Sequence, residues 1–138
     1  MESKFESGVK HIPYSCRAVF GRLSDMSNIE KVKDRLPQDK VKDLTFDRDS
    51  VTVSVPPVGG IRLKIIEREE PKCIKFVTEQ SPLPFWLWIQ LLPEGDEACK
   101  MKLTIKAELN PFIRGMVAGP LQDGIEKIAD TLAMIEYQ

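Results

Sequence analysis

The sequence contains few residues suited to nucleophilic or metal-dependent chemistry. It has one histidine, His11, and three cysteines, Cys16, Cys73 and Cys99, which lie far apart in the chain. These residues lack the spacing of a zinc site, and an odd number of cysteines argues against a disulfide framework. We therefore expect no metal site, no cofactor and reduced thiols. His11 itself is expected to be a satisfied surface residue rather than a catalytic base.

Charge imbalance and long apolar runs are also missing. The formal net charge is −1, whereas a general nucleic-acid binder has a strongly basic surface. The most apolar stretch, residues 82–93, is shorter than the roughly 20 residues that a helix needs to cross a bilayer. The first residues contain no apolar segment typical of a signal peptide. We expect a cytoplasmic protein with no transmembrane segment and no nucleic-acid partner.

The clearest structural signal is a strand that leads directly into a long helix. Within residues 99–109 the odd-numbered residues are apolar and the even-numbered ones are polar, which is the period of a strand with one buried face. Asn110 and Pro111 are typical of a helix N-cap and first helical residue. Apolar residues at helical spacing follow almost to the C-terminus, and Pro120 is expected to kink or break that helix.

The rest of the chain reads mainly as strands. Residues 5–12 are predicted to form a first strand with Phe5, Ser7 and Val9 on one face. Two short helices follow, at residues 16–23 and 27–36. Further strands are predicted at residues 41–47, 51–55, 61–65, 73–80 and 84–92, separated by turn signals. This order predicts a single α+β domain over residues 1–138.

The order of elements resembles the START-like superfamily, also called SRPBCC or helix-grip domains, and the likeness covers essentially the whole chain. The segments that carry it are residues 12–15 (Ile-Pro-Tyr-Ser), 19–25 (Val-Phe-Gly-Arg-Leu-Ser-Asp), 65–71 (Ile-Ile-Glu-Arg-Glu-Glu-Pro), 74–76 (Ile-Lys-Phe), the final strand and 120–132. The chain looks most like small bacterial members classed as polyketide cyclase or dehydrase by similarity. The resemblance implies a seven-stranded antiparallel sheet curled around the C-terminal helix, with an apolar cavity between them.

Members of this superfamily differ in function, so the fold alone does not assign one. Many bind lipids, sterols or aromatic polyketides in the cavity, and others are co-chaperones or ribosome-associated factors. Residues expected to line such a cavity are Phe76, Thr78, Leu87, Ile89, Leu103 and Ile105 from the sheet, and Phe112, Ile113, Met116 and Val117 from the helix. Polar groups that could orient a ligand are Thr78, Gln80, Asn110, Arg114 and Tyr14. The alternative is that the same residues simply fill a core.

Trp86 and Trp88 form the most unusual pair in the sequence. They share one face of the strand at residues 84–92, while the other face carries Phe85, Leu87 and Ile89. Both faces are apolar, so we expect both to be covered. We place the tryptophans on the outer face, as a partner or homodimer contact. With the opposite orientation they would line the cavity and could stack on a flat ligand.

Lysines also mark the predicted outer face. Lys100, Lys102 and Lys106 lie on the polar side of the last strand. They could form a basic patch for an acidic partner, but outward lysines are also the ordinary means of keeping a sheet soluble. We favour the second interpretation.

Three functions are compatible with these patterns. The first is binding of a small hydrophobic or amphipathic ligand, lipid-like or polyketide-like, in the cavity. The second is a cyclase or dehydrase-type enzyme that holds a reactive chain in one conformation, with Arg114 or Tyr14 assisting. A shortage of inward titratable groups argues against it. The third is a protein-interaction module that uses the outer sheet face.

Overall fold

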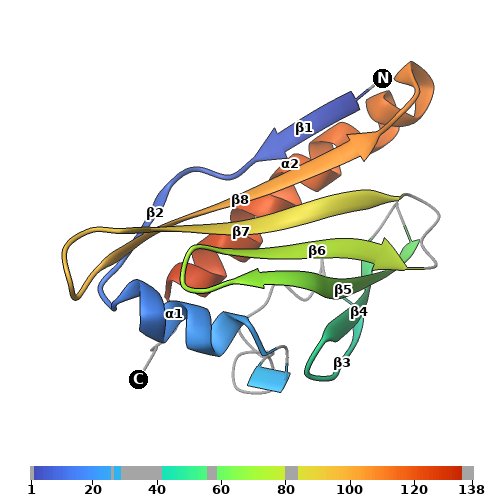
Figure 1. Ribbon diagram of the computed structural model, residues 1–138. Helices are drawn as coiled ribbons and strands as arrows, with labels where there is room; N and C mark the ends of the chain where they lie inside the picture. Colours follow the sequence, from blue (N-terminus) through green and yellow to red (C-terminus); the bar gives the residue numbers. More distant parts are fainter. Residues whose placement is uncertain (1, 26, 29–41, 56–58, 80–83, 135–138) are drawn as a thin grey trace.

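The computed structural model describes residues 2–25, 27–28, 42–55, 59–79 and 84–134, which form an antiparallel sheet packed against helices (Figure 1). The elements are β1 (Glu2–Glu6), β2 (Lys10–Ile12), α1 (Cys16–Leu23), β3 (Lys42–Phe46), β4 (Ser50–Val55), β5 (Gly59–Glu69), β6 (Cys73–Glu79), β7 (Phe85–Pro93), β8 (Cys99–Glu108) and α2 (Pro111–Ala133). The 8-stranded sheet has the order β1-β8-β7-β6-β5-β4-β3, and β2 also pairs with β8. The predicted α+β architecture is confirmed.

Strand β8 has the alternation that the sequence predicts. Its inward residues and the residue after it are all buried: Cys99, Met101, Leu103, Ile105, Ala107 and Leu109. The register continues this face across the sheet, with Leu87 of β7 opposite both Ile105 of β8 and Phe76 of β6. Burying each large side chain of this kind contributes about 1.5–3 kcal/mol, so the inner sheet face supplies much of the core.

The first strand differs from the prediction, because it is split by a β-bulge. Glu6 lies opposite Thr104 and Lys10 opposite Met101, so residues 7–9 face residues 102–103, with one residue in excess. The bulge exchanges the two faces of the strand. Phe5 points inward before it and Ile12 after it. The expectation that Val9 shares the face of Phe5 is therefore wrong, and Val9 is exposed.

Ser7 holds this bulge in place through its side chain. The Ser7 backbone N–H donates to the Leu103 carbonyl at 2.9 Å, and the Leu103 N–H donates to Ser7 Oγ at 2.9 Å. The hydroxyl thus takes the place of a strand carbonyl as acceptor. Both residues are buried, so this bond satisfies a backbone donor that water cannot reach.

The two described helices begin where the sequence predicts. In α1 the four residues Cys16, Val19, Phe20 and Leu23 are buried, as expected from their spacing. In α2 Asn110 is the N-cap, and its Oδ1 accepts a hydrogen bond of 2.8 Å from the Ile113 N–H. Most of the second short helix predicted at residues 27–36 lies outside the described residues.

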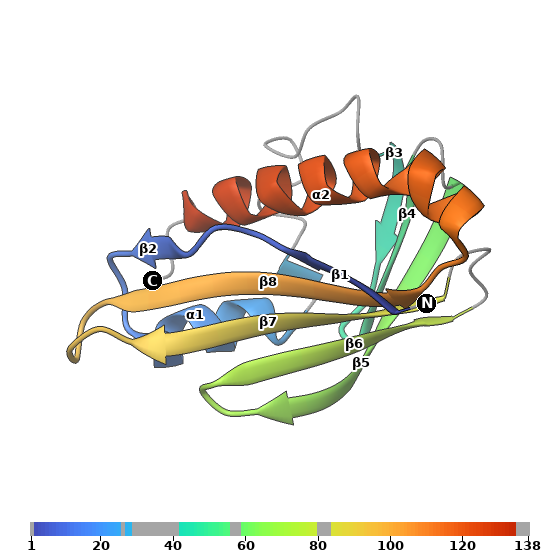
Figure 2. The same ribbon diagram turned by 90° about the horizontal axis from the view of Figure 1, so that it is seen from above.

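Helix α2 runs without a break through Pro120 to Ala133. Proline removes one backbone donor, and the carbonyl that loses its partner is that of Met116, four residues earlier. Met116 is exposed, so water can hydrogen-bond that carbonyl. Of the two expected outcomes at Pro120, a kink or a break, the break is absent because α2 is one helix from Pro111 to Ala133. Figure 2 shows α2 extending along β8 and β1.

Candidate functional site

The structure divides the expected cavity residues into three groups. Phe76, Ile89, Leu103, Ile105 and Val117 are buried in the core. Thr78, Leu87 and Ile113 are half-buried. Phe112 and Met116 are exposed, at 77% and 54% of their surface. Only the middle group combines an inward position with remaining accessibility.

The prediction that all four early helix residues face the sheet is wrong for Phe112 and Met116. A helix turns about 100° per residue, and the buried stripe of α2 is centred on Leu121, with Val117 and Ile125 beside it. On this count Phe112 and Met116 lie roughly 180° and 140° away from Leu121. They therefore project from the solvent side of the helix.

Helix α2 covers one part of the inner sheet face more closely than the rest. Among the described residues, its main sheet contacts are with β1, β2 and β8. Leu63, Thr78 and Leu87 lie inward on β5, β6 and β7, because Leu63 is opposite Thr78 and Leu87 is opposite the buried Phe76. All three remain half-buried. We call Leu63, Thr78 and Leu87 the inner strip.

The inner strip offers apolar surface and one hydroxyl. Thr78 Oγ1 accepts a hydrogen bond of 3.1 Å from the Phe85 N–H, which fixes the position of the oxygen. The hydroxyl hydrogen is a further donor of the side chain. Ile113, at the start of α2, packs against the hydrophobic core, as do Leu63 and Leu87. An apolar surface with a few fixed polar groups is the usual composition of a small-molecule site.

The other polar candidates have structural roles where the structure describes them. Asn110 caps α2. Arg114 Nε donates to Ser3 Oγ at 3.1 Å and so ties α2 to β1. Tyr14 is half-buried against the core, and Gln80 lies outside the described residues. This arrangement provides no acid–base pair aimed at the inner strip from these side chains.

Trp86 and Trp88 lie on the outer face of the sheet, since Ile89 of the same strand is buried on the inner face. Trp86 is 40% exposed. The ring of Trp88 lies between the ammonium groups of Lys75 and Lys106, at 5.4 and 5.7 Å from its centroid. These distances allow cation–π attraction between each ammonium group and the ring. Of the lysines expected on the outer face, Lys106 therefore lies against Trp88.

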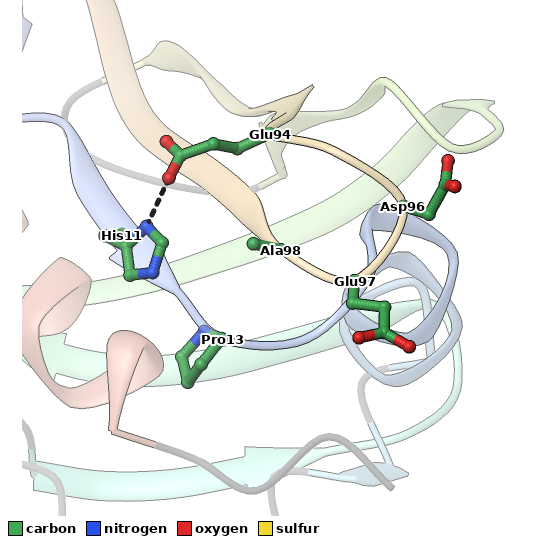
Figure 3. Close-up of a pocket in the computed structure, with 6 residues that line it drawn as sticks. All are labelled: His11, Pro13, Glu94, Asp96, Glu97 and Ala98. Atoms are coloured by element: carbon green, nitrogen blue, oxygen red, sulfur yellow. Dashed lines mark ion pairs between the residues drawn. The ribbon is translucent and has the colours of Figure 1, made fainter.

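A concave region lies at the hairpin between β7 and β8, away from the inner strip (Figure 3). It is an open depression of about 530 Å³ lined by His11, Pro13, Glu94, Asp96, Glu97 and Ala98. His11 Nδ1 is 3.0 Å from Glu94 Oε1, so the histidine is an exposed, paired surface residue. The lining is acidic and contains no nucleophile. No cluster of His, Cys, Asp or Glu suited to a metal ion occurs among the described residues.

Two cysteines that are distant in the sequence meet in the structure. Cys16 begins α1 and Cys99 begins β8, and their Sγ atoms are 2.8 Å apart in the core. Sequence reasoning placed Cys16 on the apolar stripe of a helix and Cys99 on the inward face of a strand. It gave no reason for those two positions to coincide.

Solved structures establish the fold of this chain, whereas no protein-family model and no curated protein matches its sequence. Norcoclaurine synthase from Thalictrum flavum, in complex with dopamine and hydroxybenzaldehyde, is similar with a TM-score of 0.74 and 15% identity, over 96% of this chain and 85% of that one. A START superfamily protein from Mycobacterium smegmatis is similar with a TM-score of 0.69 and 13% identity, over 96% and 94% of the two chains. A conserved protein from Geobacillus kaustophilus has a TM-score of 0.63 and 16% identity, over 96% and 93%.

The chain therefore has the START-like, helix-grip fold that its sequence predicts. Its described helices include none that is long and apolar enough to cross a membrane.

Proposed function

We propose that this protein binds a small hydrophobic or amphipathic molecule, lipid-like or polyketide-like, between the sheet and α2. The observation that carries the proposal is the inner strip, which faces inward on β5–β7 but stays half-buried, beyond the strands on which α2 mainly packs. A ligand that covers this strip would gain about 25 cal/mol per Å² of apolar surface buried, before the cost of ordering. The proposal includes a cytoplasmic location, with which free cysteines agree.

A similar fold with bound small molecules supports the same proposal. The norcoclaurine synthase structure holds dopamine and hydroxybenzaldehyde, both of which contain an aromatic ring. We infer that compact aromatic molecules are the first ligand class to test on this chain. The hydroxyl of Thr78 would then orient a polar substituent while Leu63 and Leu87 contact the ring.

Binding can be tested with 1-anilinonaphthalene-8-sulfonate as an apolar probe and with native mass spectrometry of the freshly purified protein. We expect the wild type to bind the probe, and Leu87→Trp to weaken binding at least about tenfold, or about 1.4 kcal/mol, by occupying the strip. The matched control is Leu92→Trp on the exposed side of β7, which should bind like the wild type in calorimetric titrations. A folded wild-type protein that excludes apolar probes and carries no small molecule would contradict the proposal.

A second candidate, a homodimer or partner contact through the outer sheet face, is favoured by the exposure of Trp86. Figure 2 places α2 on the opposite side of the sheet. Light scattering after size-exclusion chromatography would compare the wild type with the Trp86→Ser, Trp88→Ser double variant. If the face forms a homodimer, the wild-type mass is that of two chains and the variant mass falls to one. Equal masses for both proteins count against a tryptophan-mediated dimer.

A further inference from the structure

The contact between Cys16 and Cys99 is the strongest feature that ligand binding leaves unexplained. The two residues are separated by 83 positions in the chain, yet their sulfur atoms are 2.8 Å apart. Their exposed fractions are 6% and 0%. The third cysteine, Cys73, is half-buried on β6 opposite Gln90 of the outer face, so it cannot compete for either partner in the folded chain.

Both sulfur atoms are held by ordered backbone. Ser15 caps α1 through a hydrogen bond of 3.2 Å to its first turn, which fixes the start of the helix at Cys16. Cys99 is paired on both sides, opposite Ile12 of β2 and Pro93 of β7. A disulfide needs two Cβ atoms about 3.5–4.5 Å apart with their sulfur atoms directed at each other. Sulfur atoms already in contact across a helix and a strand meet the directional part of that requirement.

We propose that Cys16 and Cys99 form a reversible intramolecular disulfide that ties α1 to β8 when the protein meets a low-molecular-weight disulfide. One cysteine thiolate attacks the oxidant, breaks its S–S bond and releases one small thiol. The second cysteine then attacks the mixed disulfide and releases the other small thiol. One protein S–S bond forms, and the two protons and two electrons of the cysteine thiols end on the two small thiols.

Access to the pair depends on local opening of the contact between α1 and β8. Burial, and next the neighbouring Cys16 thiol, raise the pKa of Cys99 to about 12. The thiolate is the attacking species, so oxidation of the closed structure is slow. Short surface elements open more easily than the global fold unfolds, and α1 has only 8 residues. We therefore expect oxidation to proceed through transient detachment of α1.

The test uses the full chain with Cys73→Ser, which leaves the pair as the sole thiols. The protein is equilibrated in glutathione buffers of increasing oxidised fraction, and the remaining thiols are trapped with N-ethylmaleimide in denaturant. Intact mass is then measured. We expect two maleimide adducts to give way to none, with a chain about 2 Da lighter than the reduced one, since a disulfide removes two hydrogen atoms. Peptide mapping should join the peptides that contain Cys16 and Cys99.

Two results would overturn the proposal. One is that both thiols still accept maleimide in the most oxidising buffer. The other is that the stable product carries glutathione on one or both cysteines. The matched control is Cys16→Ala in the same background, in which Cys99 can form a glutathione adduct but no intramolecular disulfide. Because the readout is made on the protein that retains both cysteines, poor folding of the control leaves the result valid.

Discussion

Replacement of Ser7 by alanine tests how the β-bulge is held. The Ser7 hydroxyl accepts the Leu103 N–H at 2.9 Å and donates to the Gly8 carbonyl at 2.9 Å. Gly8 is exposed, so water can replace the second bond. Leu103 is buried, so its N–H would be left without a partner. A buried donor left unsatisfied costs about 1–3 kcal/mol, and we expect Ser7→Ala to destabilise the protein by about 2 kcal/mol.

Urea unfolding followed by circular dichroism measures this cost. A slope of about 2 kcal/mol per molar urea is typical of a small domain, so the midpoint should fall by about 1 M. The Leu103 amide should also exchange with deuterium faster than in the wild type, since its opening is eased. The control is Ser27→Ala, because Ser27 is exposed and its hydroxyl donates to the Asp25 carboxylate. We expect that change to stay within about 0.5 kcal/mol.

Equal urea midpoints for Ser7→Ala and Ser27→Ala would refute this role of the Ser7 hydroxyl. That result would mean that the Leu103 N–H finds another acceptor at no cost, so that the hydroxyl does not hold the bulge. Unchanged exchange at the Leu103 amide would lead to the same conclusion from a local measurement.

Two further predictions concern the core and the acid sensitivity of the fold. Phe76→Ala should cost about 3–5 kcal/mol because it empties a buried site, whereas Phe112→Ala should change the unfolding free energy by less than about 0.5 kcal/mol; equal costs in urea titrations would contradict the assigned orientation of α2. The ammonium of Lys10, and next the Gly8 N–H, lower the pKa of Glu126 below its ordinary value of 4.5. A carboxyl whose pKa is lowered by folding stabilises the protein above its ordinary, unfolded-state pKa. That stabilisation is lost as the pH falls through the folded-state pKa. Lys10→Met should therefore lose less stability than the wild type between about pH 5 and pH 3, and parallel pH profiles of the urea midpoint would refute this.

The fold could be predicted where a local pattern decides the structure. The alternation of β8, the apolar stripe of α1 and the Asn110–Pro111 helix start all depend on neighbours in the sequence, and all three are confirmed. The bulge at Ser7 was missed, although a signal for it exists. Phe5 and Ile12 are of opposite parity, and a regular strand cannot turn both inward. One extra residue between them was therefore required if both belong to the core.

The cysteine pair shows that a contact between two elements cannot be predicted from the pattern of either element. Each position was correctly placed as inward from its own element, Cys16 on a helix stripe and Cys99 on a strand face. Which inward residues touch depends on where α1 lies along the sheet, and that is set by packing between elements. A period along the chain carries no information on that placement.

The inner strip could not be separated from the core by sequence, because its residues have the same period as the core residues beside them. Leu87 and Ile89 are both inward on β7, but only Ile89 is buried. The period along β7 is the same for both residues, so the difference depends on which elements pack over each of them. Only Leu109 and Asn110 separate β8 from this helix, so α2 must begin at the end of β8 and return along β8 and its neighbour β1 (Figure 2). On the far strands β5–β7, Leu63, Thr78 and Leu87 keep part of their surface exposed, although Ile65, Phe76 and Ile89 on the same strands are buried. Which inward residues of these strands stay accessible is therefore set by packing between elements, and the period of a strand carries no information on that packing.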